Sequence, residues 1–375
     1  MRPTRFRASR RVLLSCSTTL LVLAGCASGR PGPADSGPAL SPTQVRQMID
    51  ESIPRGVSDR PGWVTDIYDG FTVQGLEPSH QNVCAVVAVI EQESNFHVNP
   101  PVPGLGQMAW KEIDGRAARA GVPRFLVHGA MELNSPTGRT YSERLDAART
   151  EKDLSDIYED FIGSVPLGRK LFSDWNPIRT RGPMQVNVAF AESYAAVRPY
   201  PYHVKTTVAD ELFTRRGSLY FGIAHLFAYP APYPQYVYRF ADFNAGQYAS
   251  RNAAFQNAVT RLSGIPLATD GALLSRESDV SSTELALRTL SGRLDMSESA
   301  IHSALQEGKG KDFEHSQLYK RVFALADRAA GRALPRALVP SIKLHGPKIS
   351  RKLTTSWYAH RVNGRFERCM GKPSE

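Results

Sequence analysis

The sequence predicts a mainly helical protein, and three observations support this fold class. Apolar residues return at the three-to-four spacing of one helix face, most clearly at Val83, Val86 and Ile90. Capping boxes, in which a serine precedes a Gln or Glu by three residues, occur at 41–44 and 281–284. Nearly no stretch alternates apolar and polar residues as a half-buried strand would. At 375 residues, the chain is long enough to bury a large core.

The first residues read as an export signal. Five arginines and no acid precede an apolar run over 12–23, which is shorter than the roughly 20 residues needed to span a bilayer. The Leu-Ala-Gly-Cys sequence that follows resembles the lipobox of bacterial lipoproteins. We therefore expect a signal peptide over 1–25, a lipid on Cys26 and a flexible Gly/Pro/Ser-rich tether over 26–41. Ala27, rather than Asp, implies the periplasmic side of the outer membrane by the sorting pattern of such lipoproteins.

The helices of the mature chain are expected from local signals. A proline at the first helical position favours a helix over 42–53, and three large apolar residues spaced four apart favour another over 62–71. Ser79 is the N-cap of the apolar helix, which ends before Pro100 because the residue before a proline avoids helical angles. Further helices are expected at 108–120, 142–148, 153–162, 188–197, 212–227, 282–290, 298–307 and 315–332.

Two regions are expected after the tether. Residues 42–265 form a helical domain with an insertion at 101–180, and residues 266–375 form a basic helical C-terminal region. Residues 308–375 hold 15 Lys and Arg against 5 Asp and Glu. Such a segment invites a nucleic-acid interpretation, but an exported chain meets little nucleic acid. We expect no nucleic-acid partner, and either a basic surface that faces anionic peptidoglycan or lipid, or a solvated face.

Three short motifs occur in order along the chain. They read E-S-x-F at 93–96, G-x-M-Q-V at 182–186 and F-N-A-G at 243–246. This trio resembles the lytic transglycosylases of the soluble type, whose pattern is E-S-x-F, G-L-M-Q and Y-N-A-G in a lysozyme-like helical fold. The resemblance implies a lysozyme-like domain that binds peptidoglycan glycan strands. Pro183 and Phe243 depart from the pattern, which has Leu and Tyr there.

The resemblance also implies a reaction that needs one carboxylate. Glu93 would protonate the leaving oxygen between N-acetylmuramic acid and N-acetylglucosamine. It would then take the proton of the C6 hydroxyl, which leaves a 1,6-anhydro end without using water. Burial at the end of an apolar helix tends to raise the pKa of a glutamate, as a general acid requires. The substrate-binding residues implied by the match are Ser94, Met184, Gln185, Asn244 and Gly246.

Two positions compete with these assignments. Glu91 is a rival acid, and a shift of two residues turns a helix by about 200°. We therefore expect the carboxyl groups of Glu91 and Glu93 on opposite faces, with only one of them in the cleft. The segment 104–108, G-L-G-Q-M, lies near the usual distance from Glu93, but its residue order favours 182–185 as the second motif.

Two other functions stay open beside a lipid-anchored transglycosylase. One is a hydrolysing muramidase, in which a second carboxylate positions water. The insertion offers four candidates for that role, namely Asp153, Asp156, Glu159 and Asp160. The other is a non-cleaving lipoprotein that keeps the fold and binds peptidoglycan. No protein partner is predicted.

Two of the four cysteines remain after Cys16 leaves with the signal and Cys26 takes the lipid. In an oxidising compartment Cys84 and Cys369 favour one disulfide, although each can also be a buried free thiol. The nine histidines are scattered without a metal-binding pattern. The sequence has no Gly-rich phosphate loop and no G-x-S-x-G elbow, so we expect neither a metal nor another cofactor.

Overall fold

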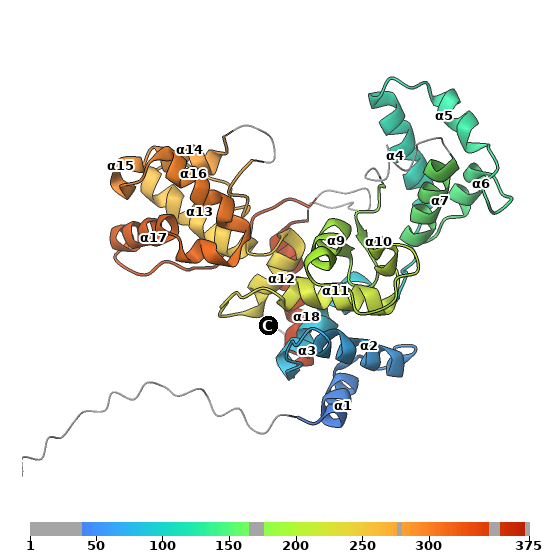
Figure 1. Cartoon of the computed structure of the whole chain (residues 1–375), viewed down its shortest axis with the longest axis horizontal. Helices are drawn as coiled ribbons and strands as arrows, with labels where there is room; N and C mark the ends of the chain where they lie inside the picture. Colours follow the sequence, from blue (N-terminus) through green and yellow to red (C-terminus); the bar gives the residue numbers. More distant parts are fainter. Residues whose placement is uncertain (1–39, 165–175, 276–279, 345–352, 372–375) are drawn as a thin grey trace, which may run out of the picture. The chain divides into compact units, whose positions relative to one another are not determined.

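The computed structural model describes residues 40–164, 176–275, 280–344 and 353–371. It is mainly helical, as predicted (Figure 1). The predicted signal peptide, the lipidated Cys26 and nearly all of the tether lie outside the described residues. Within the described ranges, no helix is both long and apolar enough to cross a membrane.

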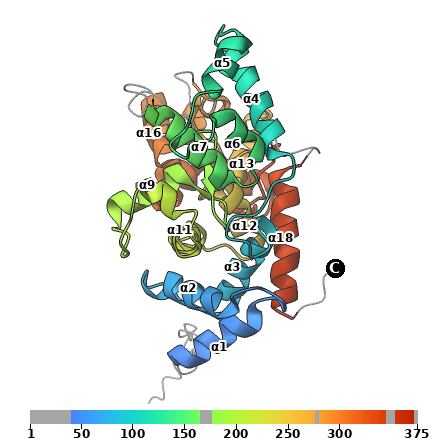
Figure 2. The same ribbon diagram turned by 90° about the vertical axis from the view of Figure 1, so that its right-hand side faces the viewer.

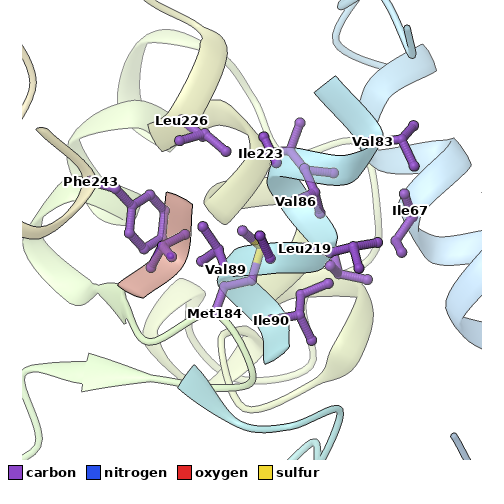
Figure 3. Packing of buried hydrophobic residues seen from close by; sticks show 14 of the residues in the cluster. Ile67, Val83, Val86, Val89, Ile90, Met184, Leu219, Ile223, Leu226 and Phe243 are labelled. Carbon is purple, nitrogen blue, oxygen red and sulfur yellow. The ribbon is translucent and has the colours of Figure 1, made fainter. Parts of the chain in front are cut away.

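A first hydrophobic core surrounds α3 (His80–Glu93), in which every residue of the stretch 83–90 is buried. Figure 3 shows Val86, Val89 and Ile90 of this helix against apolar side chains of α2 and α11. The first core also includes α1 (Pro42–Ser52), α2 (Arg60–Thr72), α9 (Val188–Val197), α10 (Val208–Glu211), α11 (Arg215–Phe227), α12 (Tyr236–Ala245) and the antiparallel pair β1 (Thr180–Arg181) and β2 (Val186–Asn187).

The predicted insertion forms a helical group with a small core of its own (Figure 1). Tyr141, Leu145 and Ile157 are buried in this core. Thr140 opens one of its helices with a capping box that it shares with Glu143. The helices of the insertion are α4 (Leu105–Arg119), α5 (Arg124–Met131), α6 (Tyr141–Ala147) and α7 (Glu151–Ser164).

A second large core lies in the C-terminal part of the chain. Phe255, Phe313 and Tyr319 meet there, with ring centroids 5.0 to 5.8 Å apart. Ser281 caps one helix of this group through the backbone N–H of Glu284. The elements are α13 (Ala249–Ser263), α14 (Ser282–Arg288), α15 (Ser291–Leu294), α16 (Glu298–Gln306), the 3₁₀ turns η2 (Glu307–Lys309) and η3 (Lys311–His315), and α17 (Gln317–Ala330).

The last helix does not belong to this second core. Helix α18 (Thr355–Cys369) packs against α3 and α12 (Figure 2). It buries Tyr358, Val362 and Phe366 in the first core. Helix α13 falls within the range predicted as the first domain, up to residue 265, but its apolar side chains belong to the second core. The end of the predicted basic region returns to the first core.

Candidate active site

Helix α3 carries Glu93 to the edge of the first core. Ser79 accepts a hydrogen bond from the backbone N–H of Asn82, which confirms the predicted N-cap. The helix ends because Asn95 and Phe96 take positive φ angles of 48° and 62°, which no helix continues. Glu93, its last residue, is half-buried.

The other two residues of the first motif are structural. Phe96 is buried and meets Trp63 edge-on, with 5.1 Å between ring centroids, as its predicted packing role requires. Ser94 is also buried, and its hydroxyl donates to the Ile90 carbonyl oxygen at 3.1 Å. The predicted supporting hydrogen bond from Ser94 is thus directed to its own helix.

Glu91 and Glu93 both approach helix α18, although the helical rotation predicted opposite faces. Glu91 forms ion pairs with Arg365 at 3.4 Å and with Arg368 at 3.2 Å. Glu93 lies beside the buried side chain of Tyr358. The pKa of Tyr358 is raised well above its ordinary value by burial, and then by the charge of the Glu93 carboxylate and by hydrogen bonding to it.

Glu93 and the buried Tyr358 are close neighbours. Tyr358 is fully enclosed by protein, and its hydroxyl lacks a partner of strict hydrogen-bond geometry among the described residues. The influence of Glu93 on the pKa of Tyr358 nevertheless requires the two groups to be near neighbours.

The second motif forms the turn between β1 and β2. Gly182 has a φ of 74°, and a Cβ atom there would overlap the Leu212 carbonyl oxygen, so only glycine fits. Met184 is fully buried and packs over Gly222, so it does not line an open cleft as predicted. It does lie beside Val89, one turn before Glu93 (Figure 3).

Gln185 is half-buried and its side-chain amide is already engaged. Its Oε1 accepts from the Thr180 hydroxyl at 2.8 Å, and its Nε2 donates to Glu151 of α7 at 2.9 Å. The residue predicted to offer an amide to the sugar is therefore held between the hairpin and the insertion. The competing segment 104–108 lies at the start of α4, outside the first core.

The third motif ends α12. Asn244 is exposed, and its Oδ1 accepts a hydrogen bond from the Thr355 hydroxyl at 2.9 Å. The amide NH₂ of Asn244 has no hydrogen-bond partner among the described residues. Gly246 has a φ of 112° and open space where a side chain would be, as expected for a turn that a ligand can approach closely.

The end of α12 is fixed by the fully buried Asp242. Its carboxylate accepts from the hydroxyl groups of Tyr229 and Tyr233 at 3.1 and 2.7 Å, and from the backbone N–H groups of Tyr248 and Ser250. Burial raises the pKa of Asp242, and these donors oppose that rise. These hydrogen bonds fix the backbone next to the third motif.

Helix α18 connects the first and third motifs. Thr355 and Tyr358 are three residues apart on this helix and therefore share a face. The first contacts Asn244 and the second contacts Glu93. Neither residue was predicted from the sequence, because both stand in the tail, outside the three motifs. The threonine N-cap and the aromatic residues within the basic tail were the available signal.

The disulfide allowed by the sequence is present and joins Cys84 of α3 to Cys369 of α18. A ring nitrogen of His80 and the two sulfur atoms lie within 4.8 Å of one another, close enough for three ligands of one metal ion. Because the two sulfurs are bonded to each other, they offer no thiolates to an ion. The disulfide instead secures the helix that carries Tyr358.

The four insertion carboxylates considered for a second catalytic role all have local partners. Asp153 accepts from the backbone N–H groups of Arg149 and Thr150, Asp156 pairs with Lys152, Glu159 accepts from Asn176, and Asp160 pairs with Arg144. Each of the four carboxylates thus forms a hydrogen bond or an ion pair with a residue of the insertion.

Comparison with known proteins shows a family and a relative but no fold match. Residues 56–372 match the family model described as "Protein of unknown function (DUF1615)". The chain is 50% identical over 352 residues to "Uncharacterized protein YaiW" of Escherichia coli (strain K12), which covers 94% of this chain and 96% of that protein. No solved structure matches. Neither description names an activity.

Proposed function

The chain belongs to the DUF1615 family, whose description names no function, so we infer the function from the site itself. We propose that the protein is a peptidoglycan lytic transglycosylase with a lysozyme-like helical domain. In the proposed reaction, Glu93 donates its proton to the glycosidic oxygen as the bond from N-acetylmuramic acid to N-acetylglucosamine breaks. The C6 hydroxyl then attacks C1 of the same muramic acid and returns its proton to Glu93. The products are a 1,6-anhydro end and a new N-acetylglucosamine end.

One observation carries this proposal. The first and third motifs lie far apart in the sequence, yet both contact one face of α18. The second motif reaches the same core through Met184, which packs beside Val89. Each motif also contributes a buried side chain to the first core, namely Phe96, Met184 and Phe243, and this convergence supports the proposal.

Two contacts assign roles within this proposal. Tyr358 positions the Glu93 carboxyl group, because a buried hydroxyl next to a carboxylate limits its orientation. Thr355 occupies the side-chain carbonyl oxygen of Asn244, which leaves the amide NH₂ of this exposed residue available to a ligand. An NH₂ group in that position suits the carbonyl oxygen of an N-acetyl group on the sugar.

The structure supports the two alternative functions, a muramidase and a non-cleaving binding protein, to different degrees. A hydrolysing muramidase needs a second carboxylate near the scissile bond, and the four insertion candidates are engaged locally. A non-cleaving peptidoglycan-binding protein is favoured by one observation, the engaged amide of Gln185. We therefore retain binding without cleavage as the second candidate.

We also propose a cellular location for the reaction. A lipid on Cys26 would anchor the chain to the outer membrane on its periplasmic side, where peptidoglycan strands are the substrate. The proposed reaction uses only the glycan and the carboxyl group of Glu93, so it calls for no cofactor and no nucleic acid.

The test is a digest of purified peptidoglycan by the chain from residue 27 onward, read by mass spectrometry of the released fragments. We expect products with anhydro ends, one water lighter than hydrolysed products. Glu93→Gln should abolish them, whereas Glu91→Gln, the matched change two residues away, should retain them. Reducing ends would favour the muramidase, and loss of activity only in the Glu91 variant would reverse the acid assignment. Binding without any product would establish the non-cleaving alternative.

A further inference from the structure

A cavity of about 310 Å³ lies away from the three motifs, where the segment before and at the start of α12 meets the second core. We call it the Tyr/Pro pocket. It is lined by three proline rings and by Tyr233, Tyr238, Arg251, Glu314, Tyr319 and Arg336. Its volume is at the lower end of the range of about 300 to 1,000 Å³ that is usual for small-ligand sites.

The two arginines of the pocket are committed to protein partners. Arg251 is buried, and its Nη1 and Nη2 atoms donate to the carbonyl oxygens of Gly310 at 2.9 Å and Gly308 at 2.8 Å. Arg336 pairs with Asp327, with 2.6 Å between Nη2 and Oδ2. A guanidinium group whose donors are occupied offers little to an anion. The pocket is therefore not built for a phosphate or a carboxylate.

Three polar groups of the pocket remain available. The hydroxyl groups of Tyr238 and Tyr319 have no hydrogen-bond partner within the described ranges. Burial raises the pKa of Tyr319 to about 12, so its hydroxyl keeps the proton that it can donate. Glu314 is half-buried, and its carboxylate forms a long ion pair with His315, with 3.7 Å between Oε1 and Nε2.

We propose that the Tyr/Pro pocket binds a neutral sugar ring of the N-acetylhexosamine class, as a glycan-binding site separate from the proposed catalytic site at Glu93. Aromatic and proline faces cover the apolar face of a pyranose, and tyrosine hydroxyl groups donate to its oxygens. The carboxylate of Glu314 accepts from sugar hydroxyl groups, in hydrogen bonds strengthened by its charge. The choice of a glycan rests on the proposed function.

The position of the pocket agrees with this ligand. Tyr238 is in the first turn of α12, and Asn244 stands six residues further along the same helix. At 1.5 Å per residue, this separation is about 9 Å along the helix axis. One rigid helix would thus carry a residue of each site, which sets a fixed spacing between them.

The test follows two alanine methyl groups by NMR in the purified protein carrying Glu93→Gln, which prevents cleavage. Ala337 lines the pocket, and Ala245 stands beside Asn244 in the third motif. On titration with the trimer of N-acetylglucosamine, we expect the Ala337 signal to shift. Glu314→Gln should raise the dissociation constant read from this signal about tenfold. Glu307→Gln, a matched change at an exposed site of the same region, should leave that constant unchanged.

Three results would overturn the proposal. They are an Ala337 signal that stays unmoved while Ala245 shifts, equal effects of the Glu314 and Glu307 variants, and a shift of Ala337 produced by stem peptide but not by the sugar trimer. The two hypotheses fail separately. Anhydro products without an Ala337 shift reject the pocket alone. An Ala337 shift in the Glu93→Gln protein, together with no product from the unmodified protein, supports the pocket and rejects the transglycosylase.

Discussion

A buried histidine next to the third motif makes the stability of the protein depend on pH. His225 of α11 is 8% exposed and lies between the rings of Phe190 and Phe243, at centroid distances of 4.3 and 4.9 Å. Neither ring nitrogen has a hydrogen-bond partner among the described residues. Burial lowers the pKa of His225 to about 4, because no neighbouring group compensates for the desolvated charge.

The sign and size of the effect follow from this shift. The unfolded chain has a histidine pKa of about 6.5, so between pH 6.5 and 4 the unfolded state binds more protons than the folded state. The free energy of unfolding therefore falls as the pH falls through this window. Between pH 7 and pH 5, His225 alone should remove about 2 kcal/mol.

The assay compares urea unfolding of the wild-type protein with that of His225→Leu at pH 7 and pH 5. Leucine has a similar volume and cannot be protonated, and the remaining ionisable groups are the same in both proteins. The wild-type protein should lose about 2 kcal/mol more than the variant on acidification. Parallel losses in the two proteins would show that His225 keeps an ordinary pKa, or that the folded state accommodates its charge.

Three further predictions concern the elements that build the site. Gly182→Ala should lower the free energy of unfolding by about 3 kcal/mol or more, because the new Cβ would overlap a backbone carbonyl oxygen. The control Gly264→Ala, at a positive φ with open space, should lower it by about 1 kcal/mol. Equal losses in the two variants would contradict the overlap at Gly182. Replacing Cys84 and Cys369 by Ser should lower the urea-unfolding free energy by about 5 kcal/mol, because the disulfide closes a sequence separation of 285 residues, and a change below about 1 kcal/mol would exclude a formed bond. Tyr358→Phe should slow product release from peptidoglycan about tenfold at nearly unchanged thermal stability, and an unchanged rate would remove its positioning role.

Local sequence signals were sufficient to predict helices whose buried face is apolar. The expected helix over 188–197 coincides with α9, and the expected helix over 298–307 differs from α16 by one residue. Ser79 and Ser281 were identified as N-caps because a cap depends on atoms only three residues away. The same locality predicted α4, α6 and α7 of the insertion, whereas α5 was not predicted.

Helices with polar buried faces were missed. Helix α13 buries Ser250, Arg251, Asn252 and Gln256, whose side chains hydrogen-bond to distant backbone or side-chain groups. A search for apolar periodicity does not detect such a face. Helix α18 was missed for a related reason, since its buried residues alternate with arginines that suggested a solvated tail.

The sequence alone determined the helical class, the order of the three motifs and the pair of cysteines left for a disulfide. Only the tertiary structure decided that the last helix returns to α3, that Tyr358 meets Glu93 and that Thr355 meets Asn244. The sequence also suggested ligand contacts for Met184 and Gln185, which the fold uses for packing and for the link to the insertion. Composition and periodicity report on neighbours within a few residues. A contact across hundreds of residues depends instead on the path of the whole chain, which forms when separate apolar faces are buried together.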